Sequence, residues 1–542
     1  MGRPRLPAGG AGLRRGLTSL AAPEERAWVP GVGQNVSQRN GIVHGRVRRV
    51  PLLSGSRVVL VPVGDDDVVL RPPPAPEQVV DAGAATRDAL RFPLSGDPLA
   101  VLAPRGGRAT IVVEPPALPL PGAPRDPRQD ALAATIDELS RCGIPDRRQT
   151  ILVAGGLGGR LAVRDAARIL LPPPRGRSFR GRLVVHDAEA ADLVRLADRA
   201  RVHRDLVESD VTVVVSAAET VLHGGPGTLL AAADADTQRR LAGADSLLEA
   251  AGTPEWELAL SVEAALAEKV PLVGVSLVLD LPRLTGRYRG YPEDEEGTER
   301  VARSPLRAFA LALPGTVRRS LLDRQPRDLA ATAAYAGHPS VAHAEALLRG
   351  VALRGTRVPE PVDTLVLGVP WIGATSPREP VNPVTAAAIG LGLALRLRRD
   401  AFPIRPGGTL VLVHSLRRSF AHGTQAPYAS MFRALRAARE PEELDGAERV
   451  ARSDERALDA YRAGTACHPL LPFADWAGCA PALSRLGRVV VAGCRDAPAA
   501  RALGFVPSHG IGSALEMARG VSGGGGRVGI LLAPPYPPLL VG

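Results

Sequence analysis

The feature that most constrains the fold of this chain is a short aliphatic run, repeated many times, that ends in small or polar residues. In the first half these runs are "ATIVVEPP", "QTILVAGGLGGR", "GRLVVHDA" and "VTVVVSAAE", and helix-like segments separate them. Continuous aliphatic runs are typical of strands buried on both faces, and strands that alternate with helices form mostly parallel sheets. We therefore predict an α/β fold with mostly parallel sheets.

The same alternation returns in the second half, so we expect two α/β domains with a cleft between them. A chain of 542 residues is too long for one ordinary core. We predict a flexible segment over 1–50, which is rich in Gly, Pro and Arg, an N-terminal α/β domain over 51–304 and a C-terminal α/β domain over 305–542. A connecting element is expected at about 241–304. Within the first domain, the acidic turn at 64–67 between two strand-like runs predicts a hairpin.

The composition argues against several classes of protein. The formal charge is +11, but 56 acidic residues accompany scattered basic ones, which indicates a solvated surface and no nucleic-acid site. The most apolar helix candidate, "TAAAIGLGLALRLRR", is shorter than the ~20 residues that cross a bilayer, so no membrane span is expected. Four widely spaced cysteines with no secretory segment ahead of them indicate a reduced, cytoplasmic setting. The oligomeric state is not indicated.

Several polar or glycine-rich segments directly follow predicted strands. These are Glu114, the turn at 155–159, His186 and the loop at 219–227. Ligands of open parallel sheets bind beyond the carboxyl ends of the strands, and sites often form between domains. We therefore expect these segments to meet at one cleft.

The loop "ETVLHGGPG" is compared with two common kinds of site. A phosphate-binding loop needs a lysine after its second glycine, and the only lysine of the chain is Lys269, in "LAEKVPL". "HGGPG" resembles the oxyanion loop of some α/β-hydrolases, but no G-x-S-x-G elbow occurs, so a hydrolase is not favoured. "GGLGGR" and "IGLGLA" each lack the third glycine of a dinucleotide-binding motif.

The histidines outside this loop have plain structural interpretations. His338 and His343 lie five residues apart without the glutamate of H-E-x-x-H, so a satisfied or exposed histidine is the better interpretation of both. His186 has two interpretations that the sequence leaves open. It lies beside a helix start capped by Asp187, or it takes part in the site.

In order and spacing, residues from about 57 to 240 and 305 to 540 resemble the nickel-pincer lactate racemase family. The resemblance is carried by "VVLVPVGDDDVVLRPPP", "IDELSRCGIPDRRQTILVAGGLGGRL", "LVVHDAEAADLVRLAD", "VHRDLVESDVTVVVSAAE" and "RALGFVPSHGIGSALEMARG". It implies two α/β domains around a nickel ion held by a thiolated pyridinium mononucleotide. It also implies a racemase or epimerase of a small 2-hydroxy acid, in which a histidine takes the hydroxyl proton and the pincer takes the α-hydride.

The sequence departs from this family at the motifs that carry the chemistry. Leu118 stands where an arginine is expected, Gly159 and Val221 stand at histidines, and Ala231 stands at the lysine that tethers the pincer. No histidine occurs between His223 and His338, so a nickel-ligand histidine is also missing and the metal ligands stay unassigned. Any pincer nucleotide would be bound without a lysine tether.

By this resemblance, the candidate site combines residues of both domains. We assign His223 as general base with Glu219 beside it, and Arg160 as the partner of a carboxylate or phosphate. The remaining candidate binding residues are Glu114, His186, Gly224, Gly225 and Gly227 from the first domain, and Trp371, Asn382 and Thr385 from the second. The alternative is a family member that has lost the racemase site and acts as a small-molecule-binding or partner-binding protein.

Overall fold

The computed structural model describes residues 48–116, 126–197, 200–250, 253–370, 380–421, 423–438, 441–521, 526–532 and 536–542. The chain separates into two compact units, Met1–Arg46 and Val47–Gly542, and all described residues belong to the second unit. The segment predicted to be flexible, 1–50, lies outside the described residues apart from its last three.

The first sheet has six strands in the order β13-β10-β9-β4-β5-β6. Their bounds are Ala331–Gly337 for β13, Leu272–Leu279 for β10, Val211–Ala217 for β9, Ala109–Val113 for β4, Gln149–Val153 for β5 and Arg182–Val185 for β6. All neighbours are parallel except β13, which pairs antiparallel with β10 at the edge. The predicted strand runs of the first half are therefore confirmed as one mostly parallel sheet.

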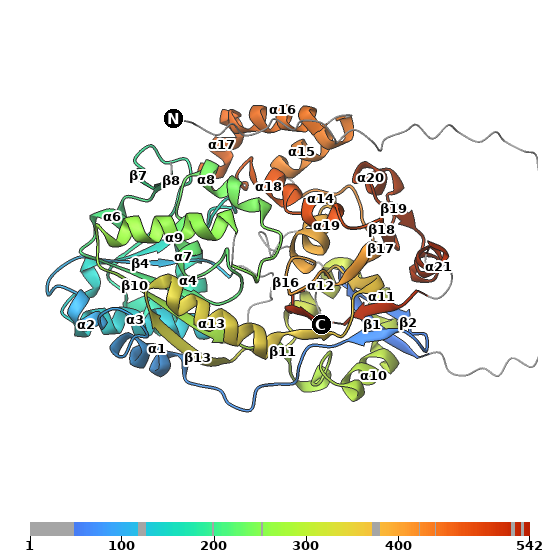
Figure 1. Cartoon of the computed structure of the whole chain (residues 1–542), viewed down its shortest axis with the longest axis horizontal. Coiled ribbons are helices and arrows are strands. Elements are labelled where there is room, and N and C mark those ends of the chain that lie inside the picture. The colour runs from blue at the N-terminus through green and yellow to red at the C-terminus, as the bar shows by residue number, and fades with distance from the viewer. Residues whose placement is uncertain are drawn as a thin grey trace, which may run out of the picture. The chain divides into compact units, whose positions relative to one another are not determined.

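Helices cover both faces of this sheet. On one face, α1 (Ala82–Arg91) and α3 (Pro127–Arg141) pack against side chains such as Ile111 and Val213. On the other face, α9 (Pro254–Ala267) packs against their neighbours, such as Val112. Figure 1 shows α9 on one side of β4 and β10, and α1 and α3 on the other. Because successive strand side chains point to opposite faces, burial on both faces requires the continuous aliphatic runs seen in the sequence.

The second sheet is parallel throughout, in the order β19-β18-β17-β15-β20-β3. Its strands are β19 (Val506–Ser508), β18 (Arg488–Ala492), β17 (Ile404–Val413), β15 (Val362–Gly368), β20 (Val528–Leu531) and β3 (Val68–Leu70). The helices α14 (Pro383–Ala387), its π-helical continuation (Ala388–Ala394), α15 (Ala426–Ala437) and α18 (Leu471–Ala477) cover one face. The helix α21 (Ile511–Val521) and the hairpin of β1 (Arg49–Ser54) and β2 (Arg57–Pro62) cover the other.

Each sheet includes one strand from the far side of residue 304, the predicted domain boundary. β3 precedes every strand of the first sheet in the sequence but joins the second sheet, whereas β13 follows residue 304 and joins the first. β10, in the segment expected to be a connector, is an interior strand of the first sheet. The division into domains at residue 304 stays a prediction.

The hairpin predicted around 64–67 is wrong. β2 pairs with β1 through a turn at Gly55, which has a φ of 54° that glycine adopts readily. β3 instead pairs in parallel with β20. The acidic turn is stabilised by its own residues, because the backbone N–H of Gly64 donates to Asp67 Oδ2 at 2.6 Å. Its sequence therefore does not indicate which strands pair.

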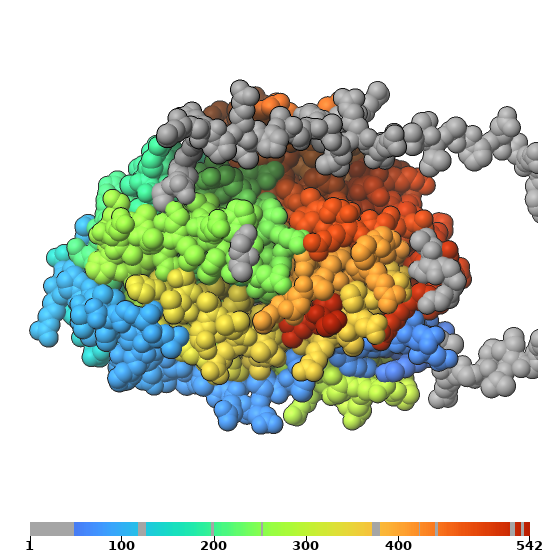
Figure 2. Space-filling model, in the orientation of Figure 1, coloured from blue at the N-terminus to red at the C-terminus, as the bar shows by residue number. Residues whose placement is uncertain are grey.

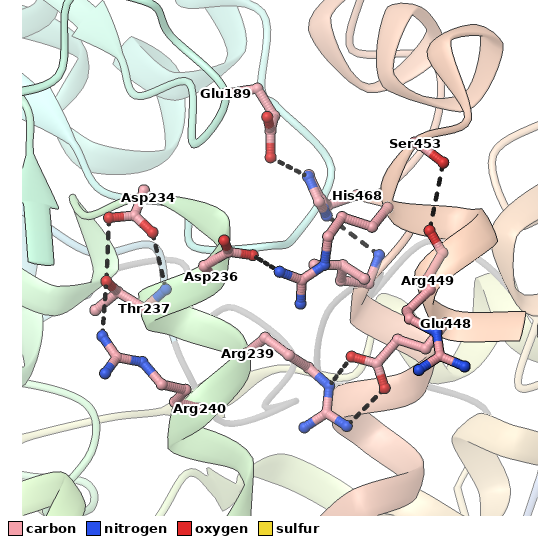
Figure 3. Close-up of polar contacts among 12 residues, drawn as sticks. Glu189, Asp234, Asp236, Thr237, Arg239, Arg240, Glu448, Arg449, Ser453 and His468 are labelled. Atoms are coloured by element: carbon pink, nitrogen blue, oxygen red, sulfur yellow. Dashed lines mark hydrogen bonds and ion pairs between the residues drawn. The ribbon is translucent and has the colours of Figure 1, made fainter. Parts of the chain in front are cut away.

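Polar contacts join segments that surround the two sheets. Arg239 of α8 (Ala235–Arg240) donates through Nε and Nη2 to both carboxylate oxygens of Glu448 in α16 (Pro441–Arg452), at 2.8 and 2.9 Å. His468 Nε2 lies 3.1 Å from Oε1 of Glu189 (Figure 3). The space-filling view shows the green surface of the first sheet's helices meeting the orange-to-red surface of the second sheet's helices directly (Figure 2).

The sequence predicted no membrane span and a reduced setting for the cysteines, and the structure describes the helices and thiols to which these expectations refer. None of the described helices has the length and apolar character that a bilayer-crossing segment requires. All four cysteines are free thiols in the structure.

Candidate functional site

A cavity of about 1150 Å³ lies at the carboxyl ends of the first sheet's strands and is closed by helices of the second. The first sheet contributes the predicted residues Glu114, Gly155–Gly159, Arg160, His186, His223 and Gly227, and the second contributes Thr385. The structure thus brings together most of the strand-end residues that the sequence singled out. We call this cavity the cleft.

The central contact of the cleft joins Glu114 to His223. Glu114 follows β4, and its Oε2 lies 2.9 Å from Nδ1 of His223 in the loop after β9. Its Oε1 accepts hydrogen bonds from the backbone N–H of Gly224 at 2.9 Å and from Thr228 Oγ1 at 2.6 Å. The carboxylate is 11% exposed and the imidazole 49% exposed. A buried carboxylate therefore orients a histidine ring that stays open to the cleft.

This contact shifts the pKa values of both groups. Burial alone raises the pKa of a carboxyl, but the hydrogen bonds from His223, Thr228 and Gly224 outweigh burial and hold the pKa of Glu114 below its ordinary value of 4.5. Burial likewise lowers the pKa of an imidazole, but the hydrogen bond and the negative charge of Glu114 outweigh it and raise the pKa of His223 above 6.5. The pair is therefore charged at weakly acidic pH.

The glycines of this loop make room for protein atoms. Gly224 and Gly225 have φ values of 93° and 51°, and a Cβ at either position would lie within 2.5 Å of an atom of the His343 side chain. His343 is fully buried, with Nδ1 3.2 Å from Ser276 Oγ and Nε2 2.8 Å from the carbonyl oxygen of Thr220. Burial lowers the pKa of His343 to about 4, so it is a neutral, structural histidine.

Glu219 lies beside the cleft and pairs with an arginine that sequence analysis did not select. Its Oε1 accepts from Arg128 Nη1 at 2.8 Å, and Arg128 also binds Asp126. Glu219 is 5% exposed and lines a small cavity of about 40 Å³ next to the cleft. The Asp126-Pro127 helix start was a readable signal for α3, because the Asp126 side chain caps the helix. Nothing in the sequence pattern indicated that Arg128, at the start of this helix, forms a hydrogen bond with Glu219.

Arg160 and His186 hold the wall of the cleft together. Arg160 donates to the carbonyl oxygens of Val185, His186 and Arg462, at 3.2, 3.2 and 2.6 Å, so its guanidinium already has partners. His186 is 2% exposed, and its Nε2 lies 2.8 Å from the carbonyl oxygen of Ala233. Burial lowers the pKa of His186 to about 4, which keeps the ring neutral at physiological pH.

The helix start proposed as one interpretation of His186 is not found. Asp187 instead accepts a hydrogen bond from the backbone N–H of Glu189 at 3.0 Å and closes a turn. Local side-chain capping is common in turns as well as at helix starts, so the sequence pattern did not distinguish them.

Of the residues predicted in the second half, two are described. Asn382 is fully buried and caps α14, with Oδ1 accepting from the backbone N–H of Thr385 at 3.0 Å. Thr385 lines the cleft. Trp371 lies outside the described residues, as does Leu118, which stands where the resembling family has an arginine.

Two further side chains line the cleft, one in the turn after the π-helical segment and one in α18, and sequence reasoning missed both. Arg396 is 5% exposed; Nη1 donates to the carbonyl oxygens of Gly392 and Gly478, while Nε and Nη2 have no hydrogen-bond partner. Burial lowers the pKa of Arg396 to about 10. Burial raises the pKa of Asp475 to about 6, although Tyr428 Oη donates to it at 2.5 Å. The pKa values of both groups are shifted because the side chains are buried, and the sequence alone does not show that burial.

Comparison with known proteins supports the fold. The lactate racemase apoprotein from Thermoanaerobacterium thermosaccharolyticum is similar at a TM-score of 0.57 and 13% identity, covering 91% of this chain and 100% of that one. A protein from Thermotoga maritima is similar at a TM-score of 0.49 and 12% identity, covering 85% and 99%. No family model and no curated protein matches the sequence. The likeness to the lactate racemase apoprotein shows that the chain has a lactate-racemase-like α/β fold.

Proposed function

We propose that the cleft binds a small 2-hydroxy acid and that the protein inverts its hydroxyl-bearing carbon as a racemase or epimerase, with His223 taking the hydroxyl proton. The observation that carries this proposal is the contact between Glu114 and His223 in a cavity large enough for a small molecule. In the neutral ring, when Nδ1 donates to Glu114, Nε2 is the unprotonated nitrogen, and no described residue forms a hydrogen bond with it. A base oriented by a carboxylate is a common arrangement for proton transfer.

One arginine of the cleft has hydrogen-bond donors left for an anionic substrate. Arg396 has two unpartnered nitrogen donors, Nε and Nη2, on a side chain that lines the cavity. The same two donors of Arg239 hold the carboxylate of Glu448, so this edge of a guanidinium matches a carboxylate in this very chain. We assign Arg396 as the partner of the substrate carboxylate in place of Arg160, whose donors are engaged.

Inversion at the carbon also requires an acceptor for the α-hydrogen. In the resembling family a pincer nucleotide supplies it, and the residues present here do not fit the tethered form of that cofactor. Ala231, half-buried in the cleft wall, stands at the tethering lysine. Within the described residues, no three His, Cys, Asp or Glu side chains gather as metal ligands. We therefore derive no step through this group.

A second candidate function is binding without turnover, in which the protein holds a small hydroxy acid or related anion. The raised pKa of His223 favours it, because a protonated imidazole donates a hydrogen bond to an anion but accepts no proton. The alanine at position 231 favours it as well.

Chiral chromatography of a panel of 2-hydroxy acids and aldonates, incubated with purified protein with and without a nickel-pincer nucleotide, tests the proposal. We expect inversion of at least one acid by the wild type, and a loss of ~10²–10⁴-fold in His223→Ala, the usual effect of removing a general base. His338→Ala, an exposed histidine outside the cleft, is the matched control. Full activity of His223→Ala would remove His223 from the mechanism, and absence of inversion by the wild type would leave the binding function.

A further inference from the structure

A second cavity, of about 800 Å³, lies at the carboxyl ends of β17, β18 and β19 in the second sheet. Carboxyl ends of parallel strands are where open α/β sheets bind ligands. The wall is formed by the turn between β1 and β2 and by the loops that follow β17 and β18. It also includes Ile511, the first residue of α21. Arg319 and Pro380 line both this cavity and the cleft, so the two adjoin.

Besides Arg319, four arginines from four separate segments line this cavity. They are Arg57 in β2, Arg318 in α12 (Gly315–Asp323), Arg417 after β17 and Arg495 after β18. Among the residues that the structure describes, no Asp or Glu lines the cavity and none of these four guanidinium groups forms a salt bridge. We call this cavity the arginine cavity.

The four arginines repel one another. Burial is the largest cause of the lowered pKa of Arg57, and the positive charges of Arg495, Arg318 and Arg417 lower it further. Elsewhere in the chain, arginines such as Arg239 meet a carboxylate. Like charges held together without a counter-charge destabilise the folded state, so such a cluster indicates a place where a bound anion completes the structure.

The wall of the arginine cavity also contains neutral hydrogen-bond donors and glycines with open space beside them. Ser415 and Ser419 contribute hydroxyl groups to the wall, and α21, eleven residues long, begins at the cavity with its N-terminus. Helix N-termini favour anions, because their first N–H groups lack partners within the helix. Gly493 and Gly510 have no atom within 4 Å of the place where a Cβ would stand, so a ligand has room to reach the backbone there.

We infer that the arginine cavity binds a small molecule that carries two adjacent phosphate groups. A pyrophosphate group carries several negative charges, which match four guanidinium groups, whereas a single carboxylate would leave most of them uncompensated. The arginines surround a concave cavity and come from four segments, which suits a compact ligand better than an extended nucleic acid. The arginine cavity is separate from the cleft, where the 2-hydroxy acid is proposed to bind. Binding of a diphosphate in the arginine cavity does not depend on that proposal.

Isothermal titration calorimetry of the full chain with inorganic pyrophosphate tests this inference, with phosphate, acetate and a short double-stranded DNA as comparison ligands. We expect pyrophosphate to bind more tightly than phosphate, no binding of acetate, and affinity that falls as salt rises. Arg57→Gln and Arg495→Gln should each weaken pyrophosphate binding about 10- to 100-fold, the usual effect of losing a charge-assisted hydrogen bond. Arg488→Gln, at the amino end of β18 and away from the cavity, should leave it unchanged.

Thermal unfolding separates loss of binding from loss of fold. Because the cluster is repulsive when empty, Arg57→Gln should unfold at the same or a higher temperature than the wild type in the absence of ligand, while pyrophosphate should raise the unfolding temperature of the wild type only. Equal pyrophosphate affinity of the wild type and both cavity variants would overturn the inference. So would an equal loss of affinity in Arg488→Gln, or binding of the DNA alone.

Discussion

Oε2 of Glu114 and Nδ1 of His223 lie 2.9 Å apart, although 109 residues separate them in the sequence. The contact forms because β4 and β9 are parallel neighbours, so the residues that follow them emerge at the same edge of the sheet. In the proposed reaction, this contact orients His223 to take the hydroxyl proton of the substrate.

Removing the carboxylate should lower the pKa of His223. In Glu114→Gln the hydrogen bond and negative charge that raise this pKa are lost, while burial, which lowers it, remains. An NMR titration of the His223 ring should show a midpoint above 6.5 in the wild type and a clearly lower one in Glu114→Gln. Glu268→Gln, an exposed carboxylate outside the cleft, should not shift it. An unchanged midpoint in Glu114→Gln would mean that the contact does not exist in solution.

The same pair should stabilise the fold over a defined pH range. The contribution of His223, whose pKa is raised, is complete below pH 6.5 and is lost as the pH rises through its folded-state pKa. The contribution of Glu114, whose pKa is lowered, is complete above pH 4.5 and is lost as the pH falls through its folded-state pKa. The stability difference between wild type and Glu114→Gln, measured by urea unfolding, should therefore be largest between about pH 4.5 and 6.5 and smaller outside it.

Breaking the buried ion pair of Arg128 should destabilise the protein. Arg128→Met removes the cation from Glu219, which is 5% exposed, and such a loss typically costs about 3–5 kcal/mol. The double variant Arg128→Met/Glu219→Gln should lose less, because Glu219, the more deeply buried of the two carboxylates that Arg128 binds, is no longer left with a broken ion pair. Arg300→Met, which breaks an exposed pair with Glu296, should change the free energy of unfolding by less than ~1 kcal/mol. A single variant no less stable than its surface control would contradict this assignment.

Arg396 should favour ligand binding at the expense of stability. Its Nε and Nη2 are buried without partners, and each such donor costs about 1–3 kcal/mol. Arg396→Met should therefore unfold at a higher temperature than the wild type and bind small carboxylates at least ~10-fold more weakly, the usual effect of losing a charged hydrogen bond. Arg449→Met, exposed on α16, serves as control. A less stable variant with undiminished binding would show that Arg396 is a structural residue.

No covalent cofactor should be found on the chain. Ala231 cannot form the link, and Lys269 precedes the amino end of β10, whereas the cleft lies at the carboxyl ends of the strands. Intact-mass spectrometry of protein co-expressed with pincer-synthesis enzymes should give the mass of the unmodified chain. An adduct mapped to Lys269 would contradict this account.

The sequence predicted the strands and the convergence of their ends, because continuous aliphatic runs and parallel topology dictate both. Glu114 and His223 were both selected, but their contact was not, since a pairing across 109 residues leaves no local pattern. Arg396 and Asp475 were missed because their unusual properties come from burial by helices far away in the sequence. Gly224 and Gly225 were selected for the approach of a ligand, and His343 packs where their side chains would stand.

Whether His223 bonds the substrate hydroxyl is tested by calorimetry at pH 8, comparing the binding of lactate and propionate, which differ only in the 2-hydroxyl, to the wild type and to His223→Ala. We expect the wild type to bind lactate about tenfold more tightly than propionate, the value of one hydrogen bond to a charged or strongly polarised group. We also expect His223→Ala to lose this preference and to keep its affinity for propionate. A preference for lactate that survives in His223→Ala, or a wild type that binds neither acid, would contradict this role of His223.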